Sequence, residues 1–463
     1  MELKNKKVLL VGLGILGGGL SIAKYLLKNE AKLTISDLRD KKELMSTINK
    51  LNNKSNNKIK YILGRNPEKE LDEADLIILN PAVSAYSPLV KKIKNIGKEY
   101  YNDYTFFLTR SSSPDSKSKA IGITGTRGKT TITTWIQHFI EGSIIGGNIP
   151  ESGLFKIIDK KPKWFVLELS SFQLEHLRKN DPSPNIAILT NIYIDHLNRY
   201  KTMKRYSDVK KKIYQNQKPE DFLIISNDET ITKEIEKDKP KSRLLFVSLK
   251  KLPPKKNGLF FIDEKLYQKD NDNINEVGKF SNLAPHEKYN FMFAALAANL
   301  AGVSWGKIFK KSRTLENPLF RQQIISIKNG LQIINDSAAT SPEATIAAIE
   351  KYKKNNLYLI TGGTDKELNS TYLAKKIANE IKQEKIFLLS GSATNNLINN
   401  LPTNYLKNGM VREFDTLEKI IKIASKEIKK GVLLFSPGAA SFEKFKNEFD
   451  RGHQFNKLVK KYF

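Results

Sequence analysis

The sequence of 463 residues contains no cysteine. A disulfide framework and metal sites built from cysteine are therefore excluded. The absence is consistent with a reducing environment, so we expect a cytoplasmic protein.

The sequence also lacks apolar runs long enough to cross a bilayer, which takes about 20 residues. Its first residues resemble a secretory signal, because Lys4, Lys6 and Lys7 precede an apolar run. Three glycines at residues 17–19 interrupt that run, and a strand, a helix and a second strand account for it. We therefore expect no cleaved signal and no membrane insertion.

Acidic residues are few relative to basic ones, with 49 Asp and Glu against 78 Lys and Arg and a formal net charge of +29. Basic residues clustered on one surface would indicate a nucleic-acid partner. The lysines are instead scattered over nearly every expected helix and loop. We therefore expect no nucleic-acid partner, and a positive field that speeds the capture of anionic substrates.

Strand and helix patterns alternate along most of the chain, which predicts α/β units with mainly parallel sheets. Two segments interrupt the alternation. Residues 110–119 (RSSSPDSKSK) are polar and contain Pro114, and residues 311–320 (KSRTLENPLF) follow a long apolar helix. These breaks predict three domains, at residues 1–112, 113–314 and 315–463.

The first glycine-rich segment, residues 8–20, reads VLLVGLGILGGGL. Gly12, Gly14 and Gly17 follow G-x-G-x-x-G, which is typical of a strand, a tight turn and a helix whose N-terminus can bind a diphosphate. Asp37 follows a second apolar strand, where an acidic side chain can hold a ribose hydroxyl. The pattern fits a nicotinamide dinucleotide, another nucleotide with a diphosphate, or a turn without a ligand.

A second glycine-rich segment, residues 121–131, reads IGITGTRGKTT. Its order of strand, glycine loop and helix is typical of a nucleoside triphosphate site, although Ile123 stands where the usual pattern has its first glycine. Backbone amides and Lys129 would bind the phosphates, and the Thr130 hydroxyl would reach Mg²⁺. The residues expected at this site are Gly125, Thr126, Gly128, Lys129, Thr130 and Thr131.

Polar side chains end two apolar strands further along the chain. Glu168 ends the strand in WFVLELSSFQLE, and Asp195 and His196 follow the strand in AILTNIYIDHLNRY. Carboxyl ends of parallel strands meet at one edge of a sheet, so these groups can share a cleft with the phosphate loop. A carboxylate there can hold Mg²⁺. Each group can also be structural, Glu168 as a helix cap and His196 as a satisfied core residue.

Four segments together resemble the Mur ligases of peptidoglycan synthesis: TGTRGKTT, LELSSFQLE, DHLNRY and SPGAASFEKFKNEFDRG. The resemblance covers all three expected domains in order. It implies Rossmann-like first and third domains around a central domain with a parallel sheet of the P-loop ATPase type. SSFQL with SPGAASF resembles the member that adds D-glutamate, and the DNPR segment typical of the member that adds diaminopimelate or lysine is absent.

The resemblance implies an ATP-dependent amide ligase that adds D-glutamate to UDP-N-acetylmuramoyl-L-alanine. ATP would phosphorylate the alanyl carboxylate, and the amine of D-glutamate would then displace phosphate through a tetrahedral intermediate. The first glycine turn would hold UDP rather than a dinucleotide. The implied partners are these two substrates, with ATP and Mg²⁺ as cofactors, and we expect a monomer.

The resemblance also assigns residues to each ligand. The UDP-sugar substrate would contact residues 80–84 (NPAVS) and Gly14, Ile15, Leu16, Asp37, Arg39, Asn148 and Ser170. Besides the phosphate loop, ATP would contact Asn290, Arg321 and Asp336. D-Glutamate would contact Thr340, Lys366, Ser441 and Phe442.

Two magnesium sites are implied as well. Thr130 and Glu168 would hold the first, and His196 with a carbamylated lysine would hold the second. Aligning YSDVKKKIY with the family selects Lys210 as that lysine, although Lys211 and Lys212 adjoin it. A carbamate anion suits a metal site better than an ammonium does, because like charges repel. The implied catalytic residues are Lys129, His196 and Lys210.

Several positions depart from the family pattern, namely Arg127, Pro150, Asn198, Glu287, Phe320, Gln323, Ala338 and Glu448. Ala338 replaces a lysine, so a charge is lost that the sequence does not visibly replace. These departures affect the expected efficiency more than the expected identity.

Three other functions are compatible with these patterns. A Mur-type ligase for a different amino acid would differ in its third domain. A basic P-loop ATPase that binds nucleic acid would show salt-sensitive binding to DNA or RNA. A degenerate ligase would bind the UDP-sugar but turn over poorly.

Overall fold

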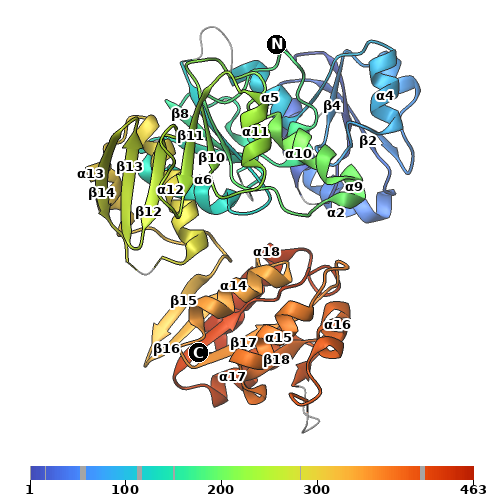
Figure 1. The fold of residues 1–463 in the computed structure, drawn as a ribbon. Coiled ribbons are helices and arrows are strands. Elements are labelled where there is room, and N and C mark those ends of the chain that lie inside the picture. Colours follow the sequence, from blue (N-terminus) through green and yellow to red (C-terminus); the bar gives the residue numbers. More distant parts are fainter. Residues whose placement is uncertain are drawn as a thin grey trace. The chain divides into compact units, whose positions relative to one another are not determined.

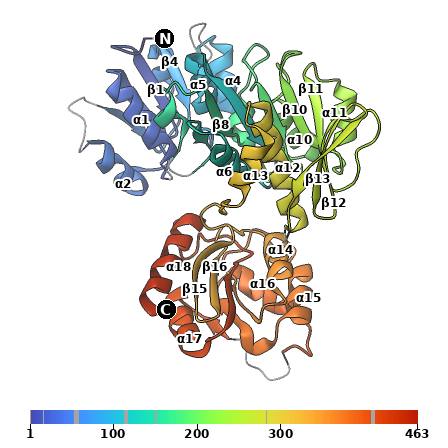
Figure 2. The same ribbon diagram turned by 90° about the vertical axis from the view of Figure 1, so that its left-hand side faces the viewer.

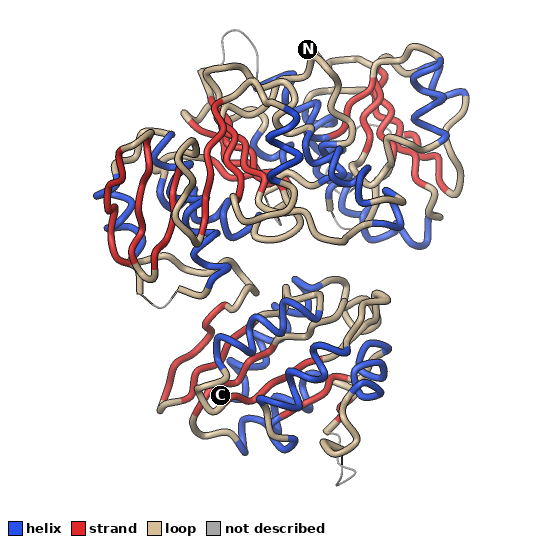
Figure 3. Tube along the Cα trace, viewed as in Figure 1, coloured by secondary structure: helices blue, strands red, loops and turns tan. Residues whose placement is uncertain are grey.

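The computed structural model describes residues 2–15, 17–52, 59–111, 117–149, 152–281, 283–406 and 412–463. The chain divides into two compact units, Met1–Leu315 (unit 1) and Glu316–Phe463 (unit 2), and each is described by itself. Unit 1 contains two sheets and unit 2 contains one (Figure 1). Helices and strands alternate along the chain (Figure 3), and the strands pair mainly in parallel. The predicted α/β fold with mainly parallel sheets is confirmed.

The first sheet of unit 1 is parallel throughout, with strand order β3-β2-β1-β4-β5. This is the order of a mononucleotide-binding Rossmann half with two further strands. The central strands β1 and β4 are almost wholly buried, as expected for apolar strands covered by helices on both faces. The elements are β1 (Lys7–Val11), α1 (Gly18–Lys28), β2 (Lys32–Asp37), α2 (Lys41–Asn52), β3 (Lys60–Leu63), α3 (Lys69–Glu73), β4 (Leu76–Leu79), α4 (Pro88–Asn95), β5 (Tyr100–Asn102) and α5 (Asp103–Ser111).

The second sheet has the order β14-β13-β12-β11-β10-β9-β6-β8-β7. It is parallel from β12 to β7, and β13 and β14 extend it as an antiparallel meander. Its strands are β6 (Lys119–Thr124), β7 (Ile144–Gly147), β8 (Trp164–Glu168), β9 (Ile186–Leu189), β10 (Phe222–Ser226), β11 (Arg243–Ser248), β12 (Gly258–Ile262), β13 (Lys265–Asp270) and β14 (Asn273–Lys279). Its helices are α6 (Lys129–Phe139), α7 (Leu154–Ile157), α8 (Ser171–Leu174), α9 (Leu197–Tyr200), α10 (Met203–Lys211), α11 (Thr232–Asp238), α12 (Pro285–Leu300) and α13 (Trp305–Ser312).

One hydrophobic core joins the two sheets of unit 1. Phe155 on α7 stacks on Phe106 of α5 with ring centroids 5.4 Å apart, and its ring edge meets Tyr25 of α1 at 5.2 Å. Figure 2 shows α5 between the two sheets. This shared core explains why residues 1–315 form one compact unit. The boundary predicted between residues 112 and 113 falls at residues 112–116, outside the described residues.

Unit 2 has one sheet with the order β15-β16-β20-β17-β18-β19, parallel except for the β15–β16 hairpin. Strands β19-β18-β17-β20 repeat the 3-2-1-4 order of the first sheet. The strands are β15 (Gln323–Lys328), β16 (Leu331–Asn335), β17 (Leu357–Thr361), β18 (Ile386–Leu389), β19 (Glu413–Phe414) and β20 (Gly431–Phe435). The helices are α14 (Pro342–Tyr352), α15 (Thr371–Glu380), the 3₁₀ turn η1 (Gln383–Lys385), α16 (Ser392–Asn400), α17 (Leu417–Glu427) and α18 (Glu448–Tyr462).

Within the described ranges, no helix combines the length and the apolar composition needed to cross a membrane.

A buried arginine on α18 holds two loops of unit 2 together. Arg451 is 0% exposed. Its guanidinium donates hydrogen bonds to Ser337 Oγ and Ser337 O, at 3.1 and 2.8 Å, and to the carbonyl oxygens of Ala439 and Ala440, at 3.1 and 2.9 Å. Arg451 therefore ties residue 337 to the loop after β20.

We expect Arg451→Ala to lower the free energy of unfolding of unit 2 by about 3–5 kcal/mol, because it leaves several buried oxygens without donors. The three tryptophans, Trp135, Trp164 and Trp305, all lie in unit 1. Denaturant unfolding is therefore best followed by amide hydrogen exchange in β20 and α18. Arg451→Lys keeps the charge with fewer donors and should lose less. Equal exchange protection in wild type and Arg451→Ala would contradict this role.

Candidate functional site

The first glycine-rich turn is held by the carboxylate of Asp37, which ends β2. Asp37 accepts hydrogen bonds from the backbone amides of Gly14 and Arg39, both at 2.9 Å, and the Arg39 guanidinium lies 3.6 Å from the same carboxylate. Gly12 has a φ of 89°, and a Cβ there would lie 2.8 Å from Asn80 Cβ. The turn therefore requires glycine at residue 12. Asp37, predicted to hold a ribose, here orders the loop that follows β1.

Ile15 extends from this turn and is 58% exposed. The predicted contact Leu16 lies outside the described residues. Asn80 N donates to Val11 O at 2.8 Å, so the segment at residues 80–84 begins beside the turn. Among the described residues, those predicted to hold the uridine diphosphate thus lie at the carboxyl ends of β1, β2 and β4.

The phosphate loop connects β6 to α6 as predicted from the sequence, and Gly128 caps the helix with a φ of 85°. Lys129 Nζ donates to the carbonyl oxygens of Gly125 and Thr126, at 3.0 and 3.1 Å. Two residues after β9 shape the loop from outside: Thr190 Oγ1 donates to Arg127 O at 2.8 Å, and Asn191 Oδ1 accepts from Arg127 N at 2.9 Å. The loop thus keeps its amides at the helix N-terminus, a position that favours anions.

Glu168, which ends β8, lies directly beside this loop. Its Oε2 accepts a hydrogen bond from Thr130 Oγ1 at 2.7 Å, and its Oε1 accepts one from Asn148 Nδ2 at 3.1 Å. A Cβ at Gly147 would lie 2.1 Å from Glu168 O, so glycine is required where β7 passes this strand end. The structure therefore brings Thr130, Glu168 and Asn148 together.

These oxygens fit a magnesium ion. Mg²⁺ is usually bound through one or two protein oxygens together with phosphates and water. The part of the chain that the structure describes holds no group of three or more His, Asp or Glu side chains placed to bind a metal. Thr130 and Glu168 beside a phosphate loop could supply the two protein oxygens, while a bound nucleotide would supply the phosphates.

The three consecutive lysines of α10 and its C-cap point to three different places. Lys210 is 2% exposed and donates to Gly125 O at 2.8 Å, beside the phosphate loop. Lys211 pairs with Asp238 at 3.0 Å and Glu234 at 3.3 Å. Lys212 Nζ donates to Glu175 O at 2.8 Å. Of the three, Lys210 alone bonds to the phosphate loop in the described structure.

Burial, together with the positive charge of Lys129, holds the pKa of Lys210 well below its usual value. The negative charges of Asp195 and Glu168 act in the opposite direction. The Lys210 amine also lies 4.7 Å from the centre of the Tyr206 ring. A neutral amine is the form of lysine that can react with carbon dioxide, so this environment suits the carbamate that the family resemblance implies.

His196 lies in a half-exposed turn between β9 and α9. It adopts a left-handed φ of 53°, and its ring packs on Phe172 at 5.0 Å and near Tyr206 at 6.0 Å. The Tyr206 hydroxyl lies 3.3 Å from Thr126 Oγ1. His196 is therefore linked to the phosphate loop and to Lys210 through Tyr206. Asn198 accepts a hydrogen bond from Arg199 N at 3.0 Å and is exposed.

Three other predicted residues lie around the same strand ends. Asn290 Oδ1 would be 2.7 Å from a Cβ at Gly128, so Asn290 contacts the phosphate loop. Ser170 caps α8 by accepting a hydrogen bond from Gln173 N at 3.3 Å. Thr131 lies in the first turn of α6. The altered residue Glu287 has a structural role, because its carboxylate accepts from Ala284 N at 2.9 Å at the start of α12.

In unit 2, Asp336 is buried at the end of β16. It accepts hydrogen bonds from Ser436 Oγ at 2.8 Å and from Gln322 N at 3.1 Å, and the charge of Arg321 acts on it. Burial raises the pKa of Asp336 to about 7, although these hydrogen bonds and charges lower it. The two residues predicted to reach ATP from this unit therefore lie close together.

This raised pKa predicts how stability depends on pH. The folded-state pKa of Asp336 lies above the value of about 3.9 in an unfolded chain, so Asp336 stabilises the folded state below about pH 4 and loses that effect as pH rises through about 7. We expect the free energy of unfolding of wild type, relative to Asp336→Asn, to fall between pH 5 and pH 8. Denaturant unfolding of both proteins measures the difference, and a constant difference would contradict the raised pKa.

Two of the four residues predicted to hold D-glutamate line one small cavity of unit 2. Thr340 and Lys366 line the cavity. Ser441 Oγ is buried without a hydrogen-bond partner among the described residues, and Phe442 is 62% exposed. Paired hydrogen bonds of 3.0 Å between Thr364 and Ala440 join the loop of Lys366 to the loop of Ser441. The tertiary structure therefore brings Lys366 and Ser441, which are far apart in sequence, to adjoining loops.

Helix α18 packs against one altered position of unit 2, Phe320. Phe320 is buried and packs against His453 at 4.8 Å and Phe449 at 6.2 Å. Gln323 Oε1 accepts from Phe320 N at 3.3 Å, and Glu448 O accepts from Ser337 Oγ at 2.7 Å. The change at Ala338 has no such partner in the described structure beyond a backbone hydrogen bond to Phe320 O at 2.9 Å. Pro150 lies outside the described residues.

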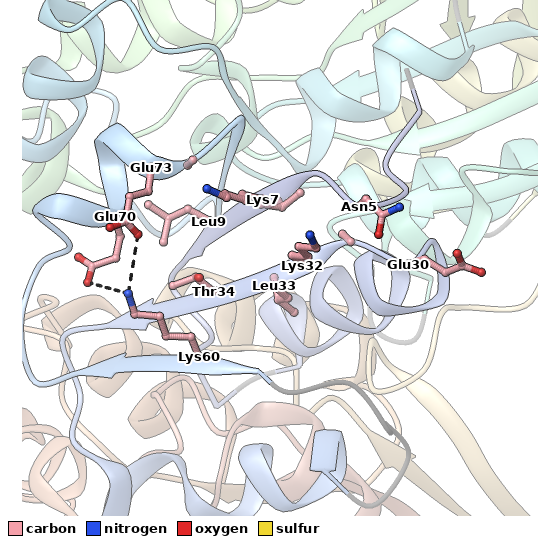
Figure 4. Close-up of a pocket in the computed structure, with 13 residues that line it drawn as sticks. Asn5, Lys7, Leu9, Glu30, Lys32, Leu33, Thr34, Lys60, Glu70 and Glu73 are labelled. Carbon is pink, nitrogen blue, oxygen red and sulfur yellow. Dashed lines mark ion pairs between the residues drawn. The ribbon is translucent and has the colours of Figure 1, made fainter.

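A separate cavity of unit 1 lies away from these residues. It measures about 700 Å³ and lies at the amino-terminal ends of β1, β2 and β3, opposite the glycine turn. Figure 4 shows Lys60 paired across it with Glu70 at 3.4 Å and Glu73 at 3.9 Å. Its described lining includes none of the site residues predicted from the sequence. This cavity therefore does not coincide with the site predicted from the sequence.

Three residues that the sequence patterns did not single out shape the phosphate loop and its surroundings. Thr190 and Asn191 order the phosphate loop, and Tyr206 links it to His196. The polar pair TN directly after the apolar strand IAIL was a usable signal, because β9 neighbours β6 in the sheet. Tyr206 opens the YSDVKKKIY segment that resembles the family, but its contact with Thr126 depends on the packing of α10.

Two family descriptions match the chain: the Mur ligase MurD-like N-terminal domain at residues 6–101, and the Mur ligase middle domain at residues 123–298. The UDP-N-acetylmuramoylalanine--D-glutamate ligase of Borreliella burgdorferi (strain ZS7) is 34% identical, covering 99% of this chain and 98% of that protein. The ligase of the same name from Clostridioides difficile (strain 630) is 32% identical, covering 99% of each chain.

Solved structures agree in fold. The UDP-N-acetylmuramate-alanine ligase MurC of Thermotoga maritima aligns with a TM-score of 0.59 at 17% identity, covering 99% of this chain and 100% of that one. The MurF ligase of Thermotoga maritima in complex with ADP aligns with a TM-score of 0.58 at 17% identity, covering 100% and 96%. The phosphate loop, its adjoining carboxylate and the glycine turn occur in the predicted order. Because two Mur ligase domain descriptions match the chain and relatives above 30% identity cover nearly all of it, this chain belongs to the Mur ligase family.

Proposed function

We propose that this protein is an ATP-dependent ligase that adds D-glutamate to UDP-N-acetylmuramoyl-L-alanine in the synthesis of peptidoglycan precursors. The names of its full-length relatives support this substrate pair. The observation that carries the chemistry is the contact between Thr130 on the phosphate loop and Glu168, with buried Lys210 bonded to the same loop. This arrangement suits phosphoryl transfer to a carboxylate.

ATP and Mg²⁺ are the proposed cofactors, and the donor set around Glu168 fits the ion. When bound, Mg²⁺ neutralises charge on the transferring phosphoryl group. We propose that Thr130 and Glu168 hold one ion, and that His196 and carbamylated Lys210 hold a second. Asn148, which donates to Glu168, would orient that carboxylate. Orientation of a ligand by a neighbouring hydrogen bond is common in metal sites.

The chain's own residues would supply the remaining electrostatics. The amides of Gly125 to Gly128 and the start of α6 bind phosphates. The Lys129 ammonium now donates to carbonyl oxygens of its own loop and would turn to the phosphates of ATP, stabilising charge that develops during transfer. Asn290, Arg321 and Asp336 would complete the nucleotide site.

For the two other substrates we propose separate sites. Gly14, Ile15, Leu16, Asp37 and Arg39 would hold the uridine diphosphate, and Asn148 and Ser170 would lie near the reacting end of the sugar substrate. Lys366, Thr340, Ser441 and Phe442 would hold the carboxylates of D-glutamate. A dicarboxylate needs cationic and hydrogen-bonding partners. The Ser441 hydroxyl, which has no hydrogen-bond partner among the described residues, and the Lys366 loop support this placement.

We also propose three domains, at residues 1–112, 113–314 and 315–463, one for each sheet. The proposed state is a cytoplasmic monomer.

Phosphate release from ATP, measured with Mg²⁺ and UDP-N-acetylmuramoyl-L-alanine, tests the function. D-Glutamate, L-lysine, diaminopimelate and RNA are added in turn. We expect release that requires D-glutamate and yields the UDP-linked dipeptide, identified by mass spectrometry. Release that requires another amino acid would reassign the specificity of unit 2. Binding of the UDP-sugar without release under any condition would identify a degenerate ligase.

A further inference from the structure

A buried ion pair in unit 1 joins the first sheet to the second. Glu175 follows α8 and its side chain is 0% exposed, while that of Arg199 on α9 is 14% exposed. Arg199 donates through Nη2 to Glu175 Oε1 at 2.6 Å and through Nε to Oε2 at 3.1 Å. The Tyr200 hydroxyl donates to Oε2 at 2.9 Å. Such a fully bonded pair fixes both side chains in one geometry.

The same ion pair forms hydrogen bonds with the backbone that follows β4. Ala85 N donates to Glu175 Oε1 at 2.7 Å, and Arg199 donates to the carbonyl oxygens of Ala82 and Pro81, at 2.8 and 3.1 Å. His176 follows Glu175 in the sequence, and its Nε2 lies 3.0 Å from Val83 O. Side chains carried by the second sheet therefore hold four backbone groups of residues 81–85.

Residues 81–85 lie beside the first glycine turn. Val83 Cγ2 would be 3.4 Å from a Cβ on Gly12. On the opposite side, the Arg199 guanidinium lies 4.0 Å from the centre of the Phe172 ring, and Phe172 packs on His196 at 5.0 Å. The ion pair thus contacts both the segment beside the glycine turn and, through Phe172, the histidine near the phosphate loop.

We propose that Arg199 and Glu175 are positioning residues that hold residues 81–85 in the conformation that lines the sugar-nucleotide site and fix this segment relative to His196. The inference rests on the proposed function, since it concerns the UDP-linked substrate. Neither side chain touches the substrate. Both act through the backbone of residues 81–85 and through Phe172.

The test compares Arg199→Gln with wild type in two measurements. Calorimetry gives the Kd for UDP-N-acetylmuramoyl-L-alanine in the absence of ATP and D-glutamate. Steady-state kinetics give the KM of each substrate and kcat. We expect the Kd and KM for the UDP-sugar to rise about ten-fold or more, because several hydrogen bonds to a charged group are lost, while the KM values of ATP and D-glutamate change less than about three-fold.

Arg178→Gln is the matched control. Arg178 also pairs with an acid, Asp181 at 3.4 Å, and lies over an aromatic ring, Tyr101 at 4.9 Å, without bonding to residues 81–85 in the described structure. The Arg178→Gln variant should leave the Kd for UDP-N-acetylmuramoyl-L-alanine unchanged. Glu175→Gln should reproduce the selective rise. The double variant Arg199→Gln/Glu175→Gln should lose less than the sum of the two single variants, because the pair acts as one unit.

A merely structural role would lower the fraction of folded enzyme, which reduces kcat and leaves all KM values unchanged. That result, or equal rises for all three substrates, would overturn the proposal. If Arg199→Gln does not fold, Arg199→Lys keeps the charge with fewer donors and should show an intermediate Kd. Wild type that binds the UDP-sugar tightly but releases no phosphate with D-glutamate would refute the proposed function while the comparison of Kd values still decides this inference.

Discussion

Replacing Lys129 by methionine should lower kcat/KM for ATP by about three orders of magnitude. Methionine keeps much of the length of the side chain and removes its charge. The ammonium stands at the end of the phosphate loop, where it donates to Gly125 O and Thr126 O. Without it, the loop loses the ammonium that would offset the negative charge that builds on the phosphates during transfer. Steady-state phosphate release measures the loss.

Lys119→Met is the matched control for this prediction. Lys119 begins β6, the strand that leads to the phosphate loop, and its side chain is exposed at the opposite end of that strand. Its replacement should leave kcat/KM for ATP within about two-fold, since exposed charges far from a site have small effects. Binding of the UDP-sugar should be unchanged in both variants. A loss below ten-fold for Lys129→Met would contradict the assigned role.

Replacing Lys210 by alanine should lower kcat by about two orders of magnitude or more, on the scale of losing one charged group from an active site. Lys210 is buried against Gly125 O, and burial with the Lys129 charge favours its neutral amine. A neutral amine can attack carbon dioxide, forming a nitrogen–carbon bond and releasing one proton, which leaves a carbamate anion. Lys210→Arg cannot form this anion and should be equally inactive.

Two measurements separate a carbamate from an ordinary ammonium. Wild type incubated with ¹³C-bicarbonate should show a carbamate carbon by NMR that Lys210→Arg lacks. Acetate at high concentration should restore part of the activity of Lys210→Ala by supplying a carboxylate. Lys211→Ala, one residue along the same helix, removes only the pairs with Glu234 and Asp238 and should keep nearly full activity. Full activity in Lys210→Arg would refute the carbamate.

Lysines 210–212 show where prediction from sequence reached its limit. Neighbouring residues on a helix point about 100° apart, so a run of three lysines always offers several directions. Which lysine faces the phosphate loop depends on how α10 packs against a segment 85 residues away. Alignment with the family selected Lys210, and the tertiary structure shows the burial and the partners that this choice needs.

Glu287 and Phe320 show a different limit. The sequence marked both as departures in a binding site, whereas Glu287 closes the first turn of α12 and Phe320 packs against α18. A residue type by itself does not reveal whether its side chain meets a ligand or a neighbouring helix. Asp37 is intermediate, because the sequence placed it at the right strand end and the structure shows it bonded to the glycine turn.

The sequence by itself determined the alternation of strands and helices, the two glycine loops and the polar residues at strand ends. These features follow from local rules, namely side-chain periodicity, the positive φ that glycine permits and the preference of parallel strands for apolar runs. Only the tertiary structure decided that one core joins the first two sheets, that Glu168 meets Thr130, and that Arg199 and Glu175 hold residues 81–85. Those contacts join residues 38 to 118 positions apart, and their partners are chosen by packing between elements, which no local pattern encodes.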